Sequence, residues 1–148
     1  MAQEAIELCR PDRERAGVTA RIALAADLPL VMVDILQIEQ VLLNLMRNSI
    51  EAISDSGSPS VSIVIEAKPT DSDFIEVRVR DTGPGFSREQ IKNGFFPLSS
   101  SKAEGLGIGL PLCRSIVEAH GGKLWLDANP HGASVNFTLP IAKNLEQG

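Results

Sequence analysis

Two asparagines lie four residues apart in a segment that is otherwise largely apolar. Asn44 and Asn48 would project from the same side of a helix, one turn apart. Leu43, Leu45 and Met46 surround them, which indicates that the two amides face a cleft. An amide oxygen is a hard ligand that Mg²⁺ accepts beside phosphate and water. The alternative interpretation is that each asparagine is an ordinary solvated helix position.

An acidic residue followed by glycines ends a segment with the alternation of a strand. Asp81 is followed by Thr82, Gly83, Pro84 and Gly85. A carboxylate at this place can accept a hydrogen bond from an exocyclic amine, and glycines let a ligand approach the backbone closely. Adenine has the matching amine. The alternative is a simple turn, because Asp and Gly after a strand are also common turn residues.

A lysine and three alternating glycines precede a helical pattern. Lys102 is followed by Gly105, Gly107 and Gly109. Alternating glycines free backbone N–H groups to turn toward an anion, and a helix N-terminus adds the positive end of its dipole. This pattern predicts phosphate binding. It does not fit the dinucleotide fingerprint GxGxxG, since the last gap is one residue short, and the chain contains no GxxxxGK[ST].

Helical periodicity occurs in three places along the chain. The clearest helix is predicted over residues 35–54, with Asp34 as its N-cap and Gln37 as the capping-box partner. Another is predicted over 110–120, ended by two glycines. Residues 4–15 predict a short helix followed by a turn, because a proline interrupts the pattern. The apolar side of the long helix consists of Ile35, Ile38, Val41, Leu42, Leu45, Ile50 and Ile53.

Alternating apolar and polar residues predict the strands. One strand is expected over 18–24, and two antiparallel neighbours are expected over 61–67 and 74–81. Residues 123–128 and 133–139 predict a hairpin. This order of elements predicts an α+β protein, a two-layer α/β sandwich with helices on one face of a mixed sheet.

Composition excludes several classes of function. The formal net charge of −5 argues against nucleic-acid binding, which needs a basic face to displace counterions from phosphates. No apolar run approaches the roughly 20 residues that span a bilayer, so we expect a cytoplasmic chain without direct membrane contact. Cys9 and Cys113 lack metal-ligand spacing, and reduced thiols are expected.

The clusters, taken in order, resemble the N, G1, F and G2 boxes of histidine kinases, in the wider family that includes DNA gyrase, HSP90 and MutL. The segments QVLLNLMRNSIEA, DTGPGF, FFPLSSSK and GLGIGL are most similar to sensor kinases of the nitrogen-fixation and dicarboxylate-sensor type. The resemblance covers roughly residues 30–140. Phe95, Pro97 and Lys102 keep the F-box pattern, whereas a leucine and two serines replace its second phenylalanine and its threonines.

The resemblance implies the Bergerat fold and its ATP site. Asn48 would ligate Mg²⁺, Asn44 would support the metal and the phosphates, and Asp81 would accept the adenine amino group. Lys102 would reach the terminal phosphates beneath a lid over residues 95–104, and it would act in catalysis together with Asn44. The other implied ATP-binding positions are Gly83, Gly85, Phe86, Ser101, Gly105, Leu106, Gly107, Ile108, Gly109 and Leu110.

The activity implied is that of the catalytic domain of a two-component sensor histidine kinase, which transfers the γ-phosphate of ATP to a histidine on a separate helical hairpin. Gyrase-like ATPases carry a water-activating glutamate where this sequence has Asn44, and an amide cannot take a proton at neutral pH. We therefore expect slow hydrolysis. Glu51 departs from the family, since many histidine kinases have a lysine there, and Lys102 is expected to substitute for it.

The acceptor histidine of the family lies in an H-E-[LIV] box, and the sequence contains none. His120 and His131 are expected to be structural, so this chain should not phosphorylate itself. The resemblance assigns residues 1–17 to the end of a linker from the hairpin, 18–142 to the catalytic domain and 143–148 to a tail. The implied partners are the hairpin of the parent kinase and, indirectly, the receiver domain of a response regulator, with this chain monomeric by itself.

Two alternatives remain open at this point. One is a serine kinase of the anti-sigma-factor type, which uses the same ATP fold without a histidine hairpin. The other is a nucleotide-binding regulatory module without catalysis, in which Trp125 and the apolar residues near Phe95 would dock a partner.

Overall fold

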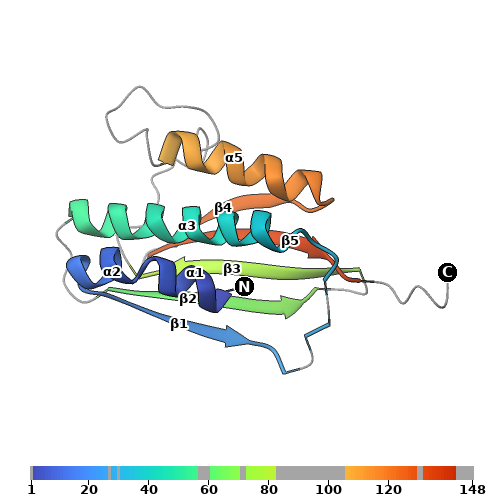
Figure 1. Ribbon diagram of the computed structural model, residues 1–148, viewed down its shortest axis with the longest axis horizontal. Helices are drawn as coiled ribbons and strands as arrows, with labels where there is room; N and C mark the ends of the chain where they lie inside the picture. Colours follow the sequence, from blue (N-terminus) through green and yellow to red (C-terminus); the bar gives the residue numbers. More distant parts are fainter. Residues whose placement is uncertain are drawn as a thin grey trace.

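The computed structural model has two layers, a five-stranded sheet and a set of helices that covers one of its faces (Figure 1). It describes residues 2–26, 28–29, 31–56, 61–70, 73–82, 106–129 and 132–142. The strands are β1 (Val18–Leu24), β2 (Val61–Pro69), β3 (Phe74–Asp81), β4 (Leu124–Asn129) and β5 (Gly132–Pro140), in the spatial order β1-β2-β3-β5-β4. The first pair is parallel and the others are antiparallel, so the predicted mixed sheet and α/β sandwich are confirmed.

The helices divide the sheet face among them. The helices α1 (Ala2–Leu8) and α2 (Arg10–Ala16) pack on β1, α3 (Ile35–Ser56) packs on β2 and β3, and α5 (Leu106–Ala119) packs on β4 and β5. Figure 1 shows that α3 and α5 lie side by side and run in opposite directions. None of the helices in the described ranges is long and apolar enough to cross a membrane.

The core lies between α3 and the central strands, as the alternation predicts. Val77 and Val79 of β3 pair with Phe137 and Val135 of β5, and all four side chains are buried. Most of the predicted apolar side of α3 packs into this core, namely Ile38, Val41, Leu42, Leu45 and Ile50. The predicted N-cap is also confirmed, because Asp34 Oδ1 accepts a hydrogen bond of 3.1 Å from the Gln37 N–H. The capping box is not formed, because the Asp34 N–H donates to His120 Nε2 instead of to the Gln37 side chain. Ile35 is an error in the prediction, since its side chain is 59% exposed.

The N-terminal segment differs from the predicted helix and turn. A second helix, α2, replaces the turn, and Pro11 lies in its first turn, where the missing N–H would have no helical partner in any case. Gly17 ends α2 in the left-handed conformation, with φ at 71°. Ala5, Ile6 and Cys9 are buried against α3, so this segment contributes to the core.

The helix α5 begins at Leu106 instead of residue 110. Glycine costs roughly 1 kcal/mol per helix position relative to alanine, which is why the two glycines favoured a later start. Leu110, Cys113 and Val117 are buried against neighbouring elements, and this packing outweighs the intrinsic preference of the glycines.

Two side chains of α5 connect it to α3. The Cys113 thiol is buried and donates a hydrogen bond to the Val41 carbonyl, with 3.8 Å between sulfur and oxygen. His120 Nε2 accepts a bond of 3.1 Å from the Asp34 N–H, so the proton of the neutral ring lies on Nδ1, 2.8 Å from the Ile116 oxygen. His120 therefore joins the end of α5 to the beginning of α3.

The buried thiol predicts how stability depends on pH. Burial raises the pKa of Cys113 from 9.0 to about 12. Between these pH values the unfolded chain loses a proton that the folded chain keeps, so the free energy of unfolding should fall with rising pH by about 1.4 kcal/mol per pH unit from this group. Urea unfolding across this range should give a shallower fall for Cys113→Ala than for wild type. Equal slopes for the two proteins would contradict the prediction.

Candidate functional site

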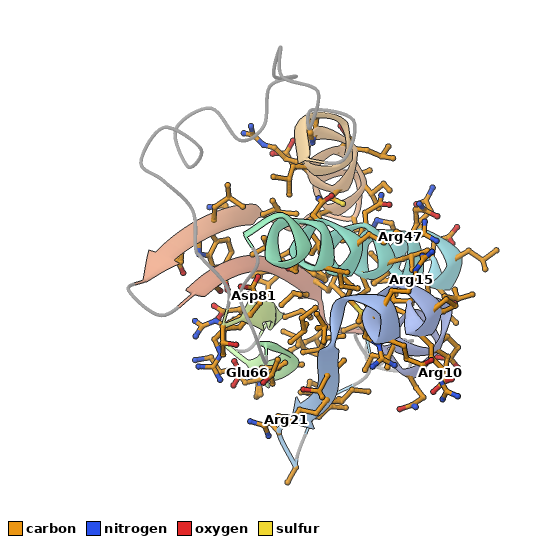
Figure 2. The ribbon with its side chains drawn as sticks, turned by 90° about the vertical axis from the view of Figure 1, so that its left-hand side faces the viewer. Arg10, Arg15, Arg21, Arg47, Glu66 and Asp81 are labelled. Atoms are coloured by element: carbon orange, nitrogen blue, oxygen red, sulfur yellow. The ribbon has the colours of Figure 1, made fainter. Side chains whose placement is uncertain are left out.

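Three of the predicted segments meet at one end of the sheet. The C-terminal half of α3, the end of β3 and the beginning of α5 all lie at the left-hand end of the molecule in Figure 1. Figure 2 looks onto this end and shows Asp81 beneath α3. The fold thus brings together the amides, the carboxylate and the start of the glycine-containing helix, which are far apart in the sequence.

The side of α3 next to its apolar side carries a row of amides. Asn48 is only 8% exposed, and its Nδ2 is buried without a hydrogen-bond partner among the described residues. Leaving such a donor unbonded costs about 1–3 kcal/mol, and native structures rarely tolerate it without a reason. Asn44, one turn earlier, is half-buried, and its Oδ1 accepts a bond of 3.2 Å from Gln40 Nε2.

The carboxylate of Asp81 lies on the helix-covered face of the sheet and is 5% exposed. The backbone of β3 is fixed on both sides at this point. On one side Thr82 and Ser62 form two hydrogen bonds of 3.1 Å, one between the backbones and one from the Ser62 N–H to the Thr82 hydroxyl. On the other side Gly132 of β5 lies so close to the Asp81 carbonyl that a Cβ atom would clash with it. Asp81 is therefore held in a rigid frame.

The start of α5 supplies backbone donors. The first N–H groups of a helix have no partner within the helix, and α5 begins with residues 106–109, which include two of the three predicted glycines. These donors and the helix dipole suit an anion. Leu110 is buried and packs into the core. The predicted residues Gly83, Gly85, Phe86, Ser101, Lys102 and Gly105 lie outside the described residues.

The donor set fits a phosphate-bearing ligand with a hard cation. In the described ranges, no group of three or more His, Cys, Asp or Glu side chains is placed to hold a metal ion. The amide oxygens of Asn44 and Asn48, together with phosphate oxygens and water, are ligands that Mg²⁺ accepts. The unbonded nitrogen of Asn48 is a donor suited to a phosphate oxygen.

Sequence reasoning missed some residues of this site. Gln40 could have been found, because it stands four residues before Asn44 and such pairs are neighbours on a helix. The sequence around Cys113 and Gly132 does not indicate their roles, because each contacts a residue far away in the sequence. Cys113 contacts Val41, and Gly132 contacts Asp81.

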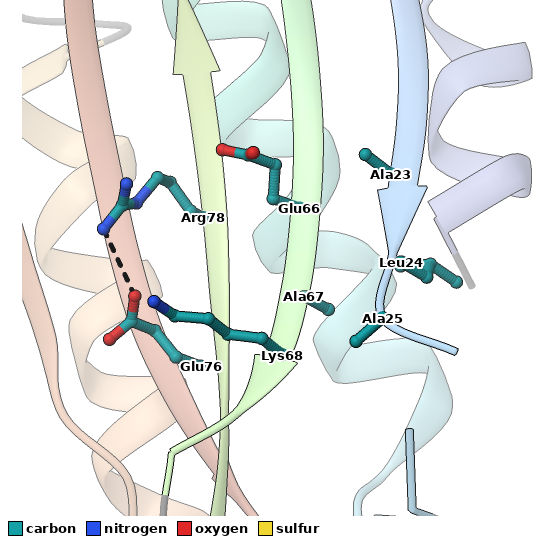
Figure 3. A pocket seen from close by; sticks show the side chains of 8 residues that line it. All are labelled: Ala23, Leu24, Ala25, Glu66, Ala67, Lys68, Glu76 and Arg78. Carbon is teal, nitrogen blue, oxygen red and sulfur yellow. Dashed lines mark hydrogen bonds and ion pairs between the residues drawn. The ribbon is translucent and has the colours of Figure 1, made fainter. Parts of the chain in front are cut away.

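A hollow of about 290 Å³ lies elsewhere, on the helix-free face of the sheet (Figure 3). Its lining combines alanines with two acidic and two basic side chains, and Arg78 and Glu76 form an ion pair of 3.4 Å there. Its lining residues are Ala23, Leu24, Ala25, Glu66, Ala67, Lys68, Glu76 and Arg78. None of them belongs to the three predicted segments of the site.

The chain is similar to known sensor kinases over most of its length. It is 41% identical over 143 residues to the sensor protein FixL of Bradyrhizobium diazoefficiens, and 36% identical over 128 residues to the sensor histidine kinase TmoS of Ectopseudomonas mendocina. These matches cover 96% and 85% of this chain but only 28% and 13% of the two relatives. The chain thus corresponds to a part of each relative.

Solved structures agree with this likeness. The catalytic domain of the histidine kinase ThkA matches with a TM-score of 0.79 and 28% identity, covering 95% of this chain and 90% of that domain. ThkA in complex with the response regulator protein TrrA matches with a TM-score of 0.75 and 26% identity, covering 95% of this chain and 39% of that one. Residues 33–143 match the family model described as histidine kinase-, DNA gyrase B- and HSP90-like ATPase. Because that match spans most of the chain, this protein belongs to the family of histidine kinase-, DNA gyrase B- and HSP90-like ATPases.

Proposed function

We propose that this chain is the ATP-binding catalytic domain of a two-component sensor histidine kinase, and that it transfers the γ-phosphate of ATP to a histidine on a separate helical hairpin. The observation that carries the proposal is the buried amide of Asn48, whose nitrogen has no partner among the described residues. A ligand that brings a phosphate oxygen to this amide would recover the hydrogen bond. The likeness to FixL and TmoS supports the same reaction class.

Each part of the site then has a role toward ATP. Asp81 would accept a hydrogen bond from the adenine amino group, and the first N–H groups of α5 would bind phosphate oxygens. Asn48 would give its oxygen to Mg²⁺, with Asn44 in support. The cation would supply neutralisation of the phosphate charge. Lys102 and the other implied ATP-binding positions outside the described residues keep the roles that the resemblance gives them.

The chemistry of this chain is positioning. Asn44 cannot act as a general base at neutral pH, because an amide takes up no proton there. A site built from amides and backbone donors holds ATP in a fixed geometry and compensates its charge, both of which favour transfer to an aligned nucleophile. Because the amide of Asn44 cannot activate water as a general base, we expect ATP hydrolysis to be slow.

The partners follow from the reaction. The acceptor would be the histidine hairpin of the same parent kinase, and the phosphate would pass on to the receiver domain of a response regulator. The structure of ThkA in complex with the response regulator protein TrrA supports the second partner by analogy. We place this domain in the cytoplasm, with residues 18–142 as its body and residues 1–17 leading in from the hairpin.

Substitutions at Asn48 and Asp81 should separate ATP binding from folding. Asn48→Ala should weaken MgATP binding roughly 10- to 100-fold, since hydrogen bonds to charged groups contribute about 1.5–3 kcal/mol. Its stability without nucleotide should stay within about 1 kcal/mol of wild type, because the variant no longer buries an unbonded donor. Asp81→Asn should also weaken MgATP binding, since the amide presents a donor to the adenine amine. Calorimetry measures the affinities and urea unfolding the stability.

The matched control for Asp81 is Asp127→Asn. Asp127 lies on the helix-free face, where its carboxylate accepts a bond of 2.7 Å from Asn136. Its replacement should leave the affinity for MgATP unchanged. If Asn48→Ala and Asp81→Asn both bind like wild type, the site assignment is wrong.

Phosphate transfer tests the reaction itself. The purified chain, mixed with radiolabelled ATP and the histidine-hairpin fragment of its parent, should place acid-labile label on the fragment and none on itself. Asn48→Ala should slow this labelling by at least the factor by which it weakens binding. Acid-stable label on a protein serine would favour the serine-kinase alternative, and ATP binding without any transfer would favour the regulatory module.

A further inference from the structure

The side chain of Asn44 is bonded by a neighbour on its own helix. Gln40 Nε2 donates to Asn44 Oδ1 across 3.2 Å, one turn along α3. Gln40 is exposed, whereas Asn44 is half-buried, so this bond lies at the edge of the site. A primary amide has one acceptor end and one donor end. The donor at position 40 therefore turns the oxygen of Asn44 toward Gln40 and its nitrogen the other way.

A second contact reaches this part of α3 from α5, one turn before Asn44. Cys113 is buried at the contact between the two helices, and its thiol donates to the Val41 carbonyl, one turn before Asn44. Burial raises the pKa of this thiol, and the neighbouring side chain of Asn44 partly opposes that rise. Gln40 thus bonds the amide of Asn44 directly, and Cys113 fixes the turn of α3 that precedes it.

We propose that Gln40 and Cys113 are positioning residues, which fix the amide of Asn44 in a single orientation for the bound MgATP. This inference rests on the proposed function. The oxygen of Asn44 has two lone pairs and Gln40 occupies one of them, so the other remains for water on the cation or for a donor of the ligand. Without the bond from Gln40, or with the turn at Val41 less firmly held by Cys113, the amide would rotate and present its nitrogen in place of its oxygen in part of the molecules.

Gln40→Met tests the contact on α3. Methionine has nearly the same length and a good helix propensity, but it cannot donate. Gln37→Met is the matched control, because Gln37 is also exposed on α3 and its side chain has no hydrogen bond to another described residue. Gln40→Met should weaken MgATP binding roughly 2- to 10-fold, the range for one ordinary hydrogen bond. Its affinity for ATP without metal should change less, and Gln37→Met should bind both like wild type.

Cys113 is tested by a pair of variants. Cys113→Ser keeps a donor and an acceptor at this position, whereas Cys113→Val replaces the thiol by an apolar side chain without either. The serine variant should retain the ratio of MgATP affinity to metal-free ATP affinity, and the valine variant should lower that ratio. If Cys113 only filled an apolar space, the polar serine would disturb the site at least as much as valine, and the serine variant would not keep the ratio.

The positioning itself can be measured without nucleotide. In a side-chain amide NMR spectrum, the Nδ2 protons of Asn44 should exchange with water faster in Gln40→Met and Cys113→Val than in wild type. Faster exchange together with the lowered MgATP ratio supports the inference. If Gln40→Met matches Gln37→Met in both measurements, the inference is overturned. If wild type binds no ATP, the proposed function fails instead, and the exchange rates still report whether Gln40 and Cys113 fix the amide.

Discussion

A buried hydrogen-bond donor that has no acceptor among the described residues is the constraint on which this site depends. The apolar side of α3 packs on the sheet, and the adjacent side carries Gln40, Asn44 and Asn48. The packing that buries Ile38, Leu42 and Leu45 also buries Asn48, whose nitrogen has no hydrogen-bond partner in the part of the chain that the structure describes. The favourable packing of the surrounding core must offset this cost of about 1–3 kcal/mol. A ligand that accepted this hydrogen bond would recover the cost, which would then contribute to its affinity.

At the carboxylate side of the site the backbone is paired on both sides. Both neighbouring strands fix the position of Asp81. The strand β3 lies between β2 and β5, and the bonds of Thr82 to Ser62 continue the pairing beyond the end of the strand. Gly132 permits an approach of the β5 backbone that any side chain would prevent. Rigid strand ends suit the recognition of a flat base, for which small displacements would cost specificity.

The sequence predicted those elements whose periodicity is long and whose contacts are local. The helix over 35–54, its Asp34 cap and the pairing of β2 with β3 could all be predicted because each signal repeats over several residues. Ile35, the start of α5 and the helix α2 were predicted wrongly, because the first turn of a helix is decided by packing and by the place of one proline or glycine. The contact between Cys113 and α3 has no local signal at all. The roles of Asn44, Asn48 and Asp81 remain predictions, although the fold brings them to one end of the sheet.

The proposed reaction also needs a nucleophile. In the described part of the chain the histidine is His120, and its ring already has a structural role. Both ring nitrogens of His120 are engaged, Nδ1 with the Ile116 oxygen and Nε2 with the Asp34 N–H. Phosphorylation at either nitrogen would break a bond at the junction of α3 and α5, the same two helices that carry the amides and the N–H groups proposed to bind phosphate. A histidine used in this way stabilises the site and is a poor acceptor. The arrangement therefore favours an acceptor histidine on a separate element, which would be brought to a site whose own residues are proposed to hold ATP in place.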